Sequence, residues 1–165
     1  MPHLTQKRLK ELFTYEPETG LFTRIARTGS RGNLGPVAGC LNDQGYLIIG
    51  IDAKEFRAHR LAWLYMTGEW PTPECDHLDL DRANNKWANL RSATRSQNGA
   101  NKRARRDNKA GIKGVCWDKQ TRKWRAQLQA NGKRINIGRF DCPAAAHFAY
   151  LVFANKAFGS FHRGA

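Results

Sequence analysis

Apolar residues in the first part of the chain recur at spacings that predict both helices and strands. Residues 4–13 carry leucine and phenylalanine at near-helical spacing, and residues 15–25 contain the turn residues of a hairpin. Residues 45–52 form a mostly apolar run that predicts a strand, and residues 56–65 predict a helix with apolar side chains inward. This helix is expected to end at Gly68, because glycine accepts the positive φ of a helix C-cap.

The segment that follows predicts a strand, a loop, a second strand and a helix. Residues 77–80 and 90–94 are the expected strands, and the residues between them are polar and turn-prone. Thr94 followed by Gln97 has the spacing of a capping box, in which each side chain satisfies a backbone amide at a helix start. Asn98 is therefore expected in the first turn of a helix, and the unit can bring its two ends together.

Residues 112–161 predict a small sheet backed by one helix. The expected strands are residues 114–120, 123–132 and 133–140. Asn131-Gly132 is a strong hairpin signal between the last two strands. Residues 143–158 predict a helix, because its proline suits a first helical turn and Gly159 can end it. We expect this helix to turn three apolar side chains toward the sheet: Phe148, Leu151 and Val152.

The positive charge is concentrated in the C-terminal part of the chain. The 165 residues carry a formal net charge of +14 and a pI near 10.2, which favours a polyanionic partner. Residues 1–98 hold 13 Lys and Arg against 11 Asp and Glu, whereas residues 99–165 hold 15 against 3. Residues 99–111 are polar and basic, so they predict a linker between a domain at 1–98 and a second domain at 112–165.

The cysteines are expected to be free thiols of an intracellular protein. Cys40, Cys75, Cys116 and Cys142 are scattered with no CxxC pair, so they indicate neither a zinc ribbon nor a disulfide framework. No apolar run is long enough to span a membrane. We therefore expect a cytoplasmic protein with no membrane partner.

Asp, His and Asn residues are packed more densely between Cys75 and Asn98 than an ordinary core requires. Carboxylate and amide oxygens can hold a hard cation and a water, and such ligands favour Mg²⁺ or Mn²⁺ over Zn²⁺. A phosphodiester is attacked by water, and the unperturbed pKa of histidine, roughly 6.5, suits a general base near neutral pH. The alternative is a loop of Asx turns, and for Asn84 and Asn85 individually we favour that alternative.

The segment DHLDLDRANNKWANLRSATRSQN resembles the HNH nuclease signature, in the subtype of phage homing endonucleases whose last position is Asn. The resemblance covers residues 56–98 and implies that Asp76 and Asn98 are metal ligands. By the same resemblance His77 is the general base, and Asn89 is the central asparagine that orients the His-bearing strand. Two further residues are candidates for contact with the scissile phosphate: His59 and Arg60. A structural histidine and a surface arginine are the alternatives for these two.

The segments GVCWD, KWRAQL and KRINIGRFDCPAAAHFAY resemble the AP2 DNA-binding domain over nearly its whole length. In that family Arg and Trp side chains of the sheet enter the major groove. Carried over by position, the candidate DNA-binding residues are Lys113, Trp117, Lys119, Arg122, Trp124, Arg125, Lys133 and Arg134. Strands alternate faces, so only about half of these are expected to contact DNA. Cys116 stands where plant members usually have a basic residue, so contact with the DNA backbone is a firmer expectation than base specificity.

These patterns and resemblances predict an α+β protein. Its first part is an HNH ββα-metal nuclease core preceded by a helix and a hairpin, and its second part is an AP2-like three-stranded antiparallel sheet backed by one helix. We expect a metal-dependent, homing-endonuclease-like phage enzyme that hydrolyses phosphodiester bonds of double-stranded DNA. We expect it to nick DNA as a monomer, and a dimer is the alternative. The other hypotheses are a non-catalytic DNA-binding regulator that uses the HNH-like unit as a scaffold, and a protein that binds or cleaves RNA.

Overall fold

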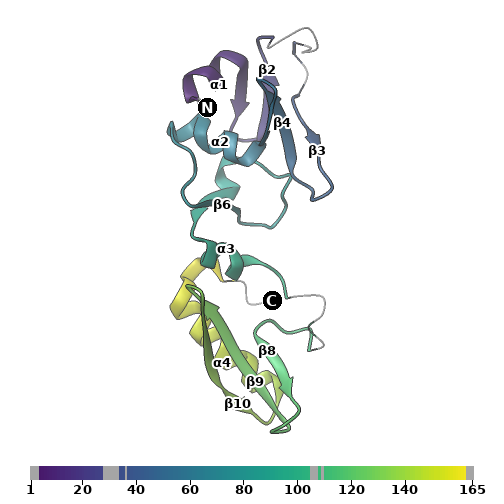
Figure 1. The fold of residues 1–165 in the computed structure, drawn as a ribbon, viewed down its shortest axis with the longest axis vertical. Helices are drawn as coiled ribbons and strands as arrows, with labels where there is room; N and C mark the ends of the chain where they lie inside the picture. Colours follow the sequence, from purple (N-terminus) through teal and green to yellow (C-terminus); the bar gives the residue numbers. More distant parts are fainter. Residues whose placement is uncertain (1–3, 28–33, 36, 105–107, 109, 163–165) are drawn as a thin grey trace. The chain divides into compact units, whose positions relative to one another are not determined.

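The chain packs into two compact units, residues Met1–Ala93 and Thr94–Ala165, each built of helices and small antiparallel sheets (Figure 1). The computed structural model describes residues 4–27, 34–35, 37–104, 108 and 110–162. The α+β class is confirmed. None of the helices in the described ranges combines the length and the apolar character that crossing a bilayer requires. The four cysteines are free thiols.

The first unit begins with a helix and a hairpin, as the sequence predicts. Helix α1 spans Gln6–Leu12, and the side chain of Thr5 caps it by accepting a hydrogen bond from the Arg8 backbone at 3.2 Å. Strands β1 (Phe13–Glu16) and β2 (Leu21–Arg24) pair antiparallel around a turn that contains Gly20. The β1 pattern alternates buried and exposed side chains, so one face of the hairpin joins the core.

A three-stranded sheet and one helix complete the core of the first unit. Strands β3 (Cys40–Leu41), β4 (Leu47–Ile51) and β5 (Lys54–Arg57) are antiparallel, and helix α2 spans Ala58–Thr67. The predicted helix start at residue 56 was wrong, because Phe56 pairs with Ile49 in the sheet. The C-terminal prediction is confirmed: Gly68 has φ of 83° and donates its N–H to the carbonyl of Leu64 at 2.9 Å.

The core of the first unit is formed by α1, α2 and the strands together. Its most deeply buried side chains are Leu9, Leu12, Phe13, Phe22, Ile49, Ile51 and Leu61. Fully burying one such side chain contributes roughly 1.5–3 kcal/mol. The core therefore holds the β1–β2 hairpin and α2 against each other, and both of these elements contact residues of the candidate site.

The hairpin that carries the candidate site lies at the end of the first unit. Strand β6 (Glu74–His77) pairs with β7 (Leu90–Ala93), and a short 3₁₀ helix η1 (Trp87–Asn89) leads into β7. The strand predicted at residues 90–94 is thus confirmed. The strand predicted at residues 77–80 was placed too far along the chain, because β6 ends at His77. The carboxylates of Asp79 and Asp81 accept hydrogen bonds from backbone amides two residues further on, at 2.8 and 2.9 Å. These Asx turns end the strand.

The second unit opens with the predicted capped helix. Helix α3 spans Arg95–Asn101, and Thr94 and Gln97 form both hydrogen bonds of a capping box. Ala100 is buried in the core of this unit, where α3 packs against the last helix. Residues 99–101 of the predicted linker are therefore helical, while residues 105–107 and 109 of it lie outside the described residues. The division at 98 and 111 stays a prediction.

The rest of the second unit is a three-stranded antiparallel sheet covered by one helix. The strands are β8 (Val115–Asp118), β9 (Lys123–Ala130) and β10 (Lys133–Phe140), in the order β10-β9-β8. Helix α4 (Pro143–Phe158) packs on all three strands, and a 3₁₀ turn η2 (Gly159–Phe161) follows it. Asn131 and Gly132 both have positive φ, as the predicted two-residue hairpin requires.

Helix α4 buries a different face from the predicted one. Its buried residues are Ala146, Tyr150, Ala154 and Phe158, a row with a spacing of four. Two of the three residues expected to face the sheet are instead exposed, Phe148 by 69% and Val152 by 51%, and Leu151 is half-buried. The helix is apolar on nearly every side, so the apolar pattern alone does not select the face that packs.

Candidate functional site

Strand β6 places Asp76 and His77 side by side in the buried end of a hairpin. Asp76 is 4% exposed and His77 is 5% exposed. In the β6–β7 register Asp76 lies opposite Arg91, and His77 lies opposite Leu90. Two polar side chains at this depth need partners, because burial of an unpaired polar or charged group is strongly unfavourable.

The environment of His77 keeps its imidazole neutral at neutral pH. Burial lowers the pKa of His77 below its ordinary value, against the opposing effects of a hydrogen bond to Asn85 and of the nearby Asp79. Nε2 of His77 lies 3.3 Å from Oδ1 of Asn85, and the ring of His59 meets the His77 ring edge-on at 4.7 Å. A neutral imidazole can accept a proton, which is what a general base must do.

His59 and Arg60 are neighbours on α2 with opposite environments. His59 is 4% exposed, and burial together with the adjacent His77 lowers its pKa to about 3. It is therefore uncharged and packs between the rings of Tyr46 and His77. Arg60 is exposed, and its guanidinium lies 5.6 Å from the centre of the Trp70 ring. Of the two predicted phosphate contacts, only Arg60 presents a charge to solvent.

Asp76 forms a buried ion pair that sequence reasoning missed. Nη2 and Nε of Arg91 each lie 3.0 Å from Oδ2 of Asp76, and the Arg91 side chain is only 14% exposed. The pair fixes the orientation of the carboxylate, as hydrogen-bonded neighbours do for metal-binding side chains. Pairing residues 74–77 with residues 90–93 in register would have identified Arg91, because it stands directly across from Asp76.

Asn89 organises the loop that follows His77. Its Nδ2 donates to Oδ1 of Asp79 at 2.9 Å and to the carbonyl of Asn84 at 2.8 Å, and its Oδ1 accepts from the Asp79 backbone at 3.1 Å. Its backbone carbonyl accepts from Leu78 at 2.9 Å. These bonds tie the start of the loop to its end. Asn89 thus positions the chain immediately after His77, in line with an orienting role.

Asn85, for which the sequence analysis favoured a turn role, lies beside the candidate base His77. It is 1% exposed, contacts His77 through Oδ1, and donates from Nδ2 to the carbonyl of Ala83 at 2.9 Å. Its own carbonyl accepts from the hydroxyl of Tyr15 at 2.7 Å. Burial raises the pKa of Tyr15, so this hydroxyl stays protonated and able to donate. No local signal marked Asn85, since its partner lies 70 residues away.

The β1–β2 hairpin braces the loop around Asn85. The Trp87 amide donates to the carbonyl of Pro17 at 3.0 Å. Gly20 has φ of 76°, and a Cβ there would lie 2.4 Å from backbone atoms of Asn85 and Lys86. Only glycine fits this contact without displacing the loop. The N-terminal hairpin is therefore part of the structure that holds His77 and its partner.

The candidate metal ligands supply oxygen donors only. Among the described residues, no group of three or more His, Cys, Asp and Glu side chains is arranged to hold a metal ion. Asp76 belongs to β6 in the first unit. Asn98 belongs to α3 in the second unit, where its amide donates to the Thr94 carbonyl at 2.9 Å. One carboxylate and one amide oxygen suit a hard cation that keeps water and substrate as its other ligands.

The sheet of the second unit separates the predicted DNA-binding residues into two faces. Residues opposite each other in register share a face, and successive residues alternate. Arg125 and Arg134 therefore point away from α4. Trp117 and Trp124 lie on the α4 side, with their rings 5.2 Å apart, and Lys133 shares this side. Lys119 and Arg122 lie in the β8–β9 turn.

Two further observations change the predicted DNA-binding set. The ammonium group of Lys113 donates to the carbonyls of Ala100 and Lys102, so it helps fasten α3 within the unit. Arg139 lies opposite Arg125 on the face away from α4, and its Nε donates to Oδ2 of Asp118 at 3.0 Å. Arg139 was not among the predicted residues, and a bulge between Asn136 and Gly138 places it on the same face as Arg134.

Comparisons with known proteins agree with the two parts of the chain. Residues 56–100 match the model of the HNH endonuclease family, and residues 110–160 match the AP2 domain. Protein 3.8 of Escherichia phage T7 is 34% identical over 110 residues, which cover 65% of this chain and 88% of that protein. An uncharacterized HNH endonuclease of Acanthamoeba polyphaga mimivirus is 29% identical over 123 residues, which cover 73% of this chain and 63% of that protein. No solved structure matches the chain significantly.

Proposed function

Because this chain belongs to the HNH endonuclease family and carries an AP2 domain, we propose that it is a metal-dependent DNA endonuclease, homing-endonuclease-like, that nicks double-stranded DNA. The observation that carries the proposal is the neutral, buried imidazole of His77 beside Asp76 in β6, inside the matched HNH segment. A buried neutral histidine next to a carboxylate is a functional-site arrangement that an inert scaffold does not require.

In the proposed mechanism His77 accepts a proton from the attacking water. Asn85 holds the imidazole from one side and His59 packs against its ring from another, so the ring has little freedom to turn. Asn89 fixes the chain just after His77. Preorganisation of this kind removes the need to order the base during the reaction. The water oxygen bonds to phosphorus as the bond from phosphorus to the 3′ oxygen breaks, and the 3′ oxygen takes up a proton from solvent, which leaves a 5′-phosphate and a 3′-hydroxyl.

Asp76 and Asn98 are the residues that would hold the divalent cation, Mg²⁺ or Mn²⁺. When bound, this ion acts as a Lewis acid that stabilises the departing sugar oxygen. Arg91 keeps the Asp76 carboxylate oriented and shares its charge. The assignment of Asn98 rests on the family motif, in which it occupies the final position.

The AP2 domain supplies affinity for DNA. Arg125, Arg134 and the turn residues Lys119 and Arg122 are the proposed contacts, on the sheet face away from α4 or in the turn beside it. Phosphate neutralisation by these side chains would hold DNA near the nuclease site and raise its local concentration. Two basic groups on the sheet face and two in the adjacent turn are consistent with contact to the DNA backbone, which does not by itself specify sequence.

The test is cleavage of supercoiled plasmid with Mg²⁺, with Mn²⁺ and with EDTA, comparing wild type with His77→Ala. We expect nicked product with either metal, none with EDTA, and a loss of about 10²–10⁴-fold in the variant, the range for removal of a general base. His147→Ala, in α4, is the matched control and should cleave like wild type.

Duplex DNA binding is measured in parallel, with RNA as a competitor. Binding that persists in His77→Ala separates the chemistry from DNA affinity. Tight DNA binding without cleavage under any metal would refute the nuclease proposal in favour of a non-catalytic regulator. Preference for the RNA competitor would reassign the substrate.

A further inference from the structure

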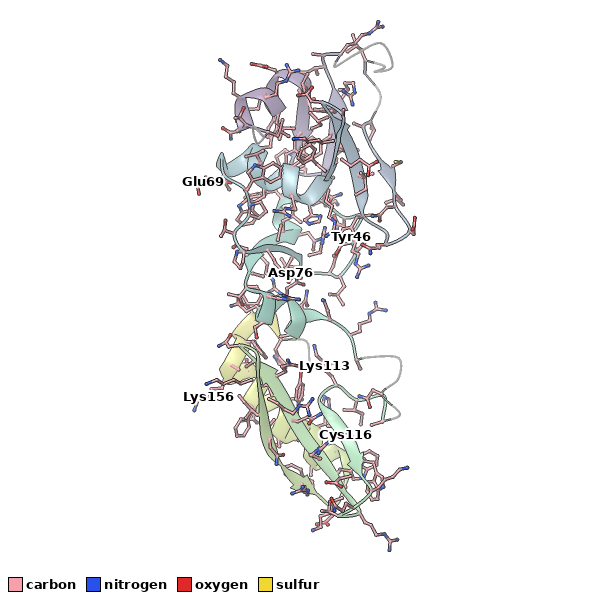
Figure 2. All side chains as sticks on the ribbon, in the orientation of Figure 1. Tyr46, Glu69, Asp76, Lys113, Cys116 and Lys156 are labelled. Carbon is pink, nitrogen blue, oxygen red and sulfur yellow. The ribbon has the colours of Figure 1, made fainter. Side chains whose placement is uncertain are left out.

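Tyr46 lies between two arginine side chains beside the candidate general base. The guanidinium carbon of Arg57 is 4.4 Å from the centre of the Tyr46 ring, and that of Arg82 is 4.9 Å from it. Tyr46 is labelled in Figure 2, at the turn between β3 and β4. The three residues come from the β3–β4 turn, the end of β5 and the loop after β6, so only the folded unit assembles them.

Hydrogen bonds to the backbone hold Tyr46 and the two arginines in place. The Tyr46 amide donates to Oδ1 of Asn42 at 2.9 Å, and its carbonyl accepts from the Asn42 amide at 2.9 Å. Arg82 is fastened to the same turn, because its Nη1 donates to the carbonyl of Gln44 at 2.7 Å. The backbone of Arg57 pairs with Ile48 in the sheet, and Nη2 of Arg57 donates to Oε1 of Gln44 at 3.5 Å. Both guanidinium groups are therefore presented on a fixed surface rather than on free chains.

Tyr46 lies next to His77. The Tyr46 ring centre lies 6.2 Å from that of His77 and 5.3 Å from that of His59. The rings of Tyr46, His59 and His77 all pack against one another, so the two cations lie beside the candidate base. If a phosphodiester is attacked by a water held at His77, the neighbouring phosphates of the same DNA strand would lie close to the guanidinium groups of Arg57 and Arg82.

Neither cation is neutralised by the protein. Within the described ranges, no carboxylate oxygen lies within 4.0 Å of a nitrogen of Arg57 or Arg82, whereas Arg8 pairs with Asp52 and Arg91 pairs with Asp76. Both side chains are exposed, so their remaining N–H donors face solvent. Two guanidinium groups that form no ion pair among the described residues and pack on an aromatic ring form a site for an oxyanion, because arginine binds phosphate through two parallel hydrogen bonds and stacks on aromatic faces.

From this geometry we infer that Arg57 and Arg82, mounted on Tyr46, clamp the phosphates of the DNA strand that is cut at His77. The inference rests on the proposed function for its substrate. It adds a DNA contact of the nuclease unit itself, separate from the AP2 domain. The clamp binds the DNA backbone, so it acts on any sequence and positions the scissile phosphate rather than selecting it.

The test compares Arg57→Ala, Arg82→Ala and the double variant with Lys7→Ala, which removes one exposed positive charge from α1. Each arginine variant should lower kcat/KM for nicking by about 10- to 100-fold, the effect of losing a hydrogen bond to a charged group. The double variant should also reduce the salt slope of duplex binding by about two. Lys7→Ala should match wild type in kcat/KM.

Tyr46→Leu removes the aromatic ring on which both guanidinium groups pack and leaves the net charge unchanged. It should lower kcat/KM while the salt slope of binding stays as in wild type, because both cations remain but lose their fixed geometry. Thermal unfolding of every variant checks that the unit is folded. If the arginine variants equal Lys7→Ala in both rate and salt slope, the clamp is overturned while the nuclease proposal stands. If wild type cleaves nothing yet the double variant loses salt slope, Arg57 and Arg82 bind DNA phosphates as inferred, while the nuclease proposal and the positioning role of the clamp both fail.

Discussion

The two units of this protein place their polar groups in opposite ways. Residues 1–93 hold 12 Lys and Arg against 11 Asp and Glu, whereas residues 94–165 hold 16 against 3. Among the described residues, the first unit buries His59, Asp76, His77 and Asn85, and the second buries Asn101. Chemistry at a bond needs a few groups fixed in a dry site, while affinity for a polyanion needs many exposed charges. The buried polar groups are concentrated in the first unit, and most of the excess positive charge is in the second.

Loss of the buried ion pair is expected to have the largest effect. Arg91→Leu leaves the Asp76 carboxylate buried without its cation, which should destabilise the first unit by about 3–5 kcal/mol. Chemical denaturation measures the change. Arg8→Leu is the matched control, because its pair with Asp52 is nearly half exposed and solvent-exposed ion pairs contribute little to stability. Equal losses in the two variants would show that burial of the Asp76 pair has no special role.

Two glycines allow each unit to be disturbed separately. Gly20→Ala would push against the backbone of Asn85, and Gly114→Ala would place a Cβ 2.1 Å from the Tyr150 ring. Both residues have positive φ, so each variant should cost about 2–4 kcal/mol through backbone strain and overpacking. Gly20→Ala should reduce nicking and preserve DNA binding, and Gly114→Ala should weaken binding.

The control for this pair is Gly132→Ala. Gly132 also has positive φ, but nothing lies within 4 Å of a Cβ built on it, so only the backbone cost of about 1–2 kcal/mol applies. Measurements of unfolding, nicking and binding on all three variants separate the effect of backbone strain at the glycine from the effect of displacing the atoms that a Cβ would meet. Loss of binding in Gly20→Ala at full thermal stability would contradict the assignment of the two activities to separate units.

Removal of positive charge from the sheet is expected to change the salt dependence of DNA binding. Arg125→Ala with Arg134→Ala removes two cations from the face away from α4, and should reduce the salt slope of duplex binding by about two. Lys156→Ala removes a charge from the last turn of α4 and should leave the slope close to that of wild type. A larger loss from Lys156→Ala would place the DNA on the helix side.

The smallest effect expected is on stability at mildly acidic pH. His59 titrates near pH 6.5 when unfolded and near pH 3 in the folded unit, so below pH 6.5 the unfolded chain binds the proton that the folded chain excludes. Stability should therefore fall as the pH falls through this window, by up to about 1.4 kcal/mol per pH unit. His59→Asn should flatten the dependence in denaturation between pH 6.5 and 5.5. An unchanged slope would mean that His59 is solvated.

Several elements could be predicted from the sequence because their signals are satisfied locally. The capping box of Thr94 and Gln97, the Asn131-Gly132 turn and the proline at the start of α4 each use groups within a few residues. The predicted strand at 77–80 was wrong for an equally local reason. Asp79 and Asp81 bond to nearby backbone amides, and these turns outweigh the pattern of side chains.

Sequence by itself therefore determined the kinds of elements, the Asp76-His77 motif and the uneven charge. Only the tertiary structure decided which side chains meet. Asn85 reaches Tyr15 across 70 residues, Arg91 reaches Asp76 across 15, and Tyr46 collects two arginines from separate segments. The same holds for α4. Its apolar residues lie on nearly every side, and only packing against the sheet determines that Tyr150 lies on the buried face. Contacts of this kind depend on strand register and on the core that closes the long loops, and neither is written in a local pattern.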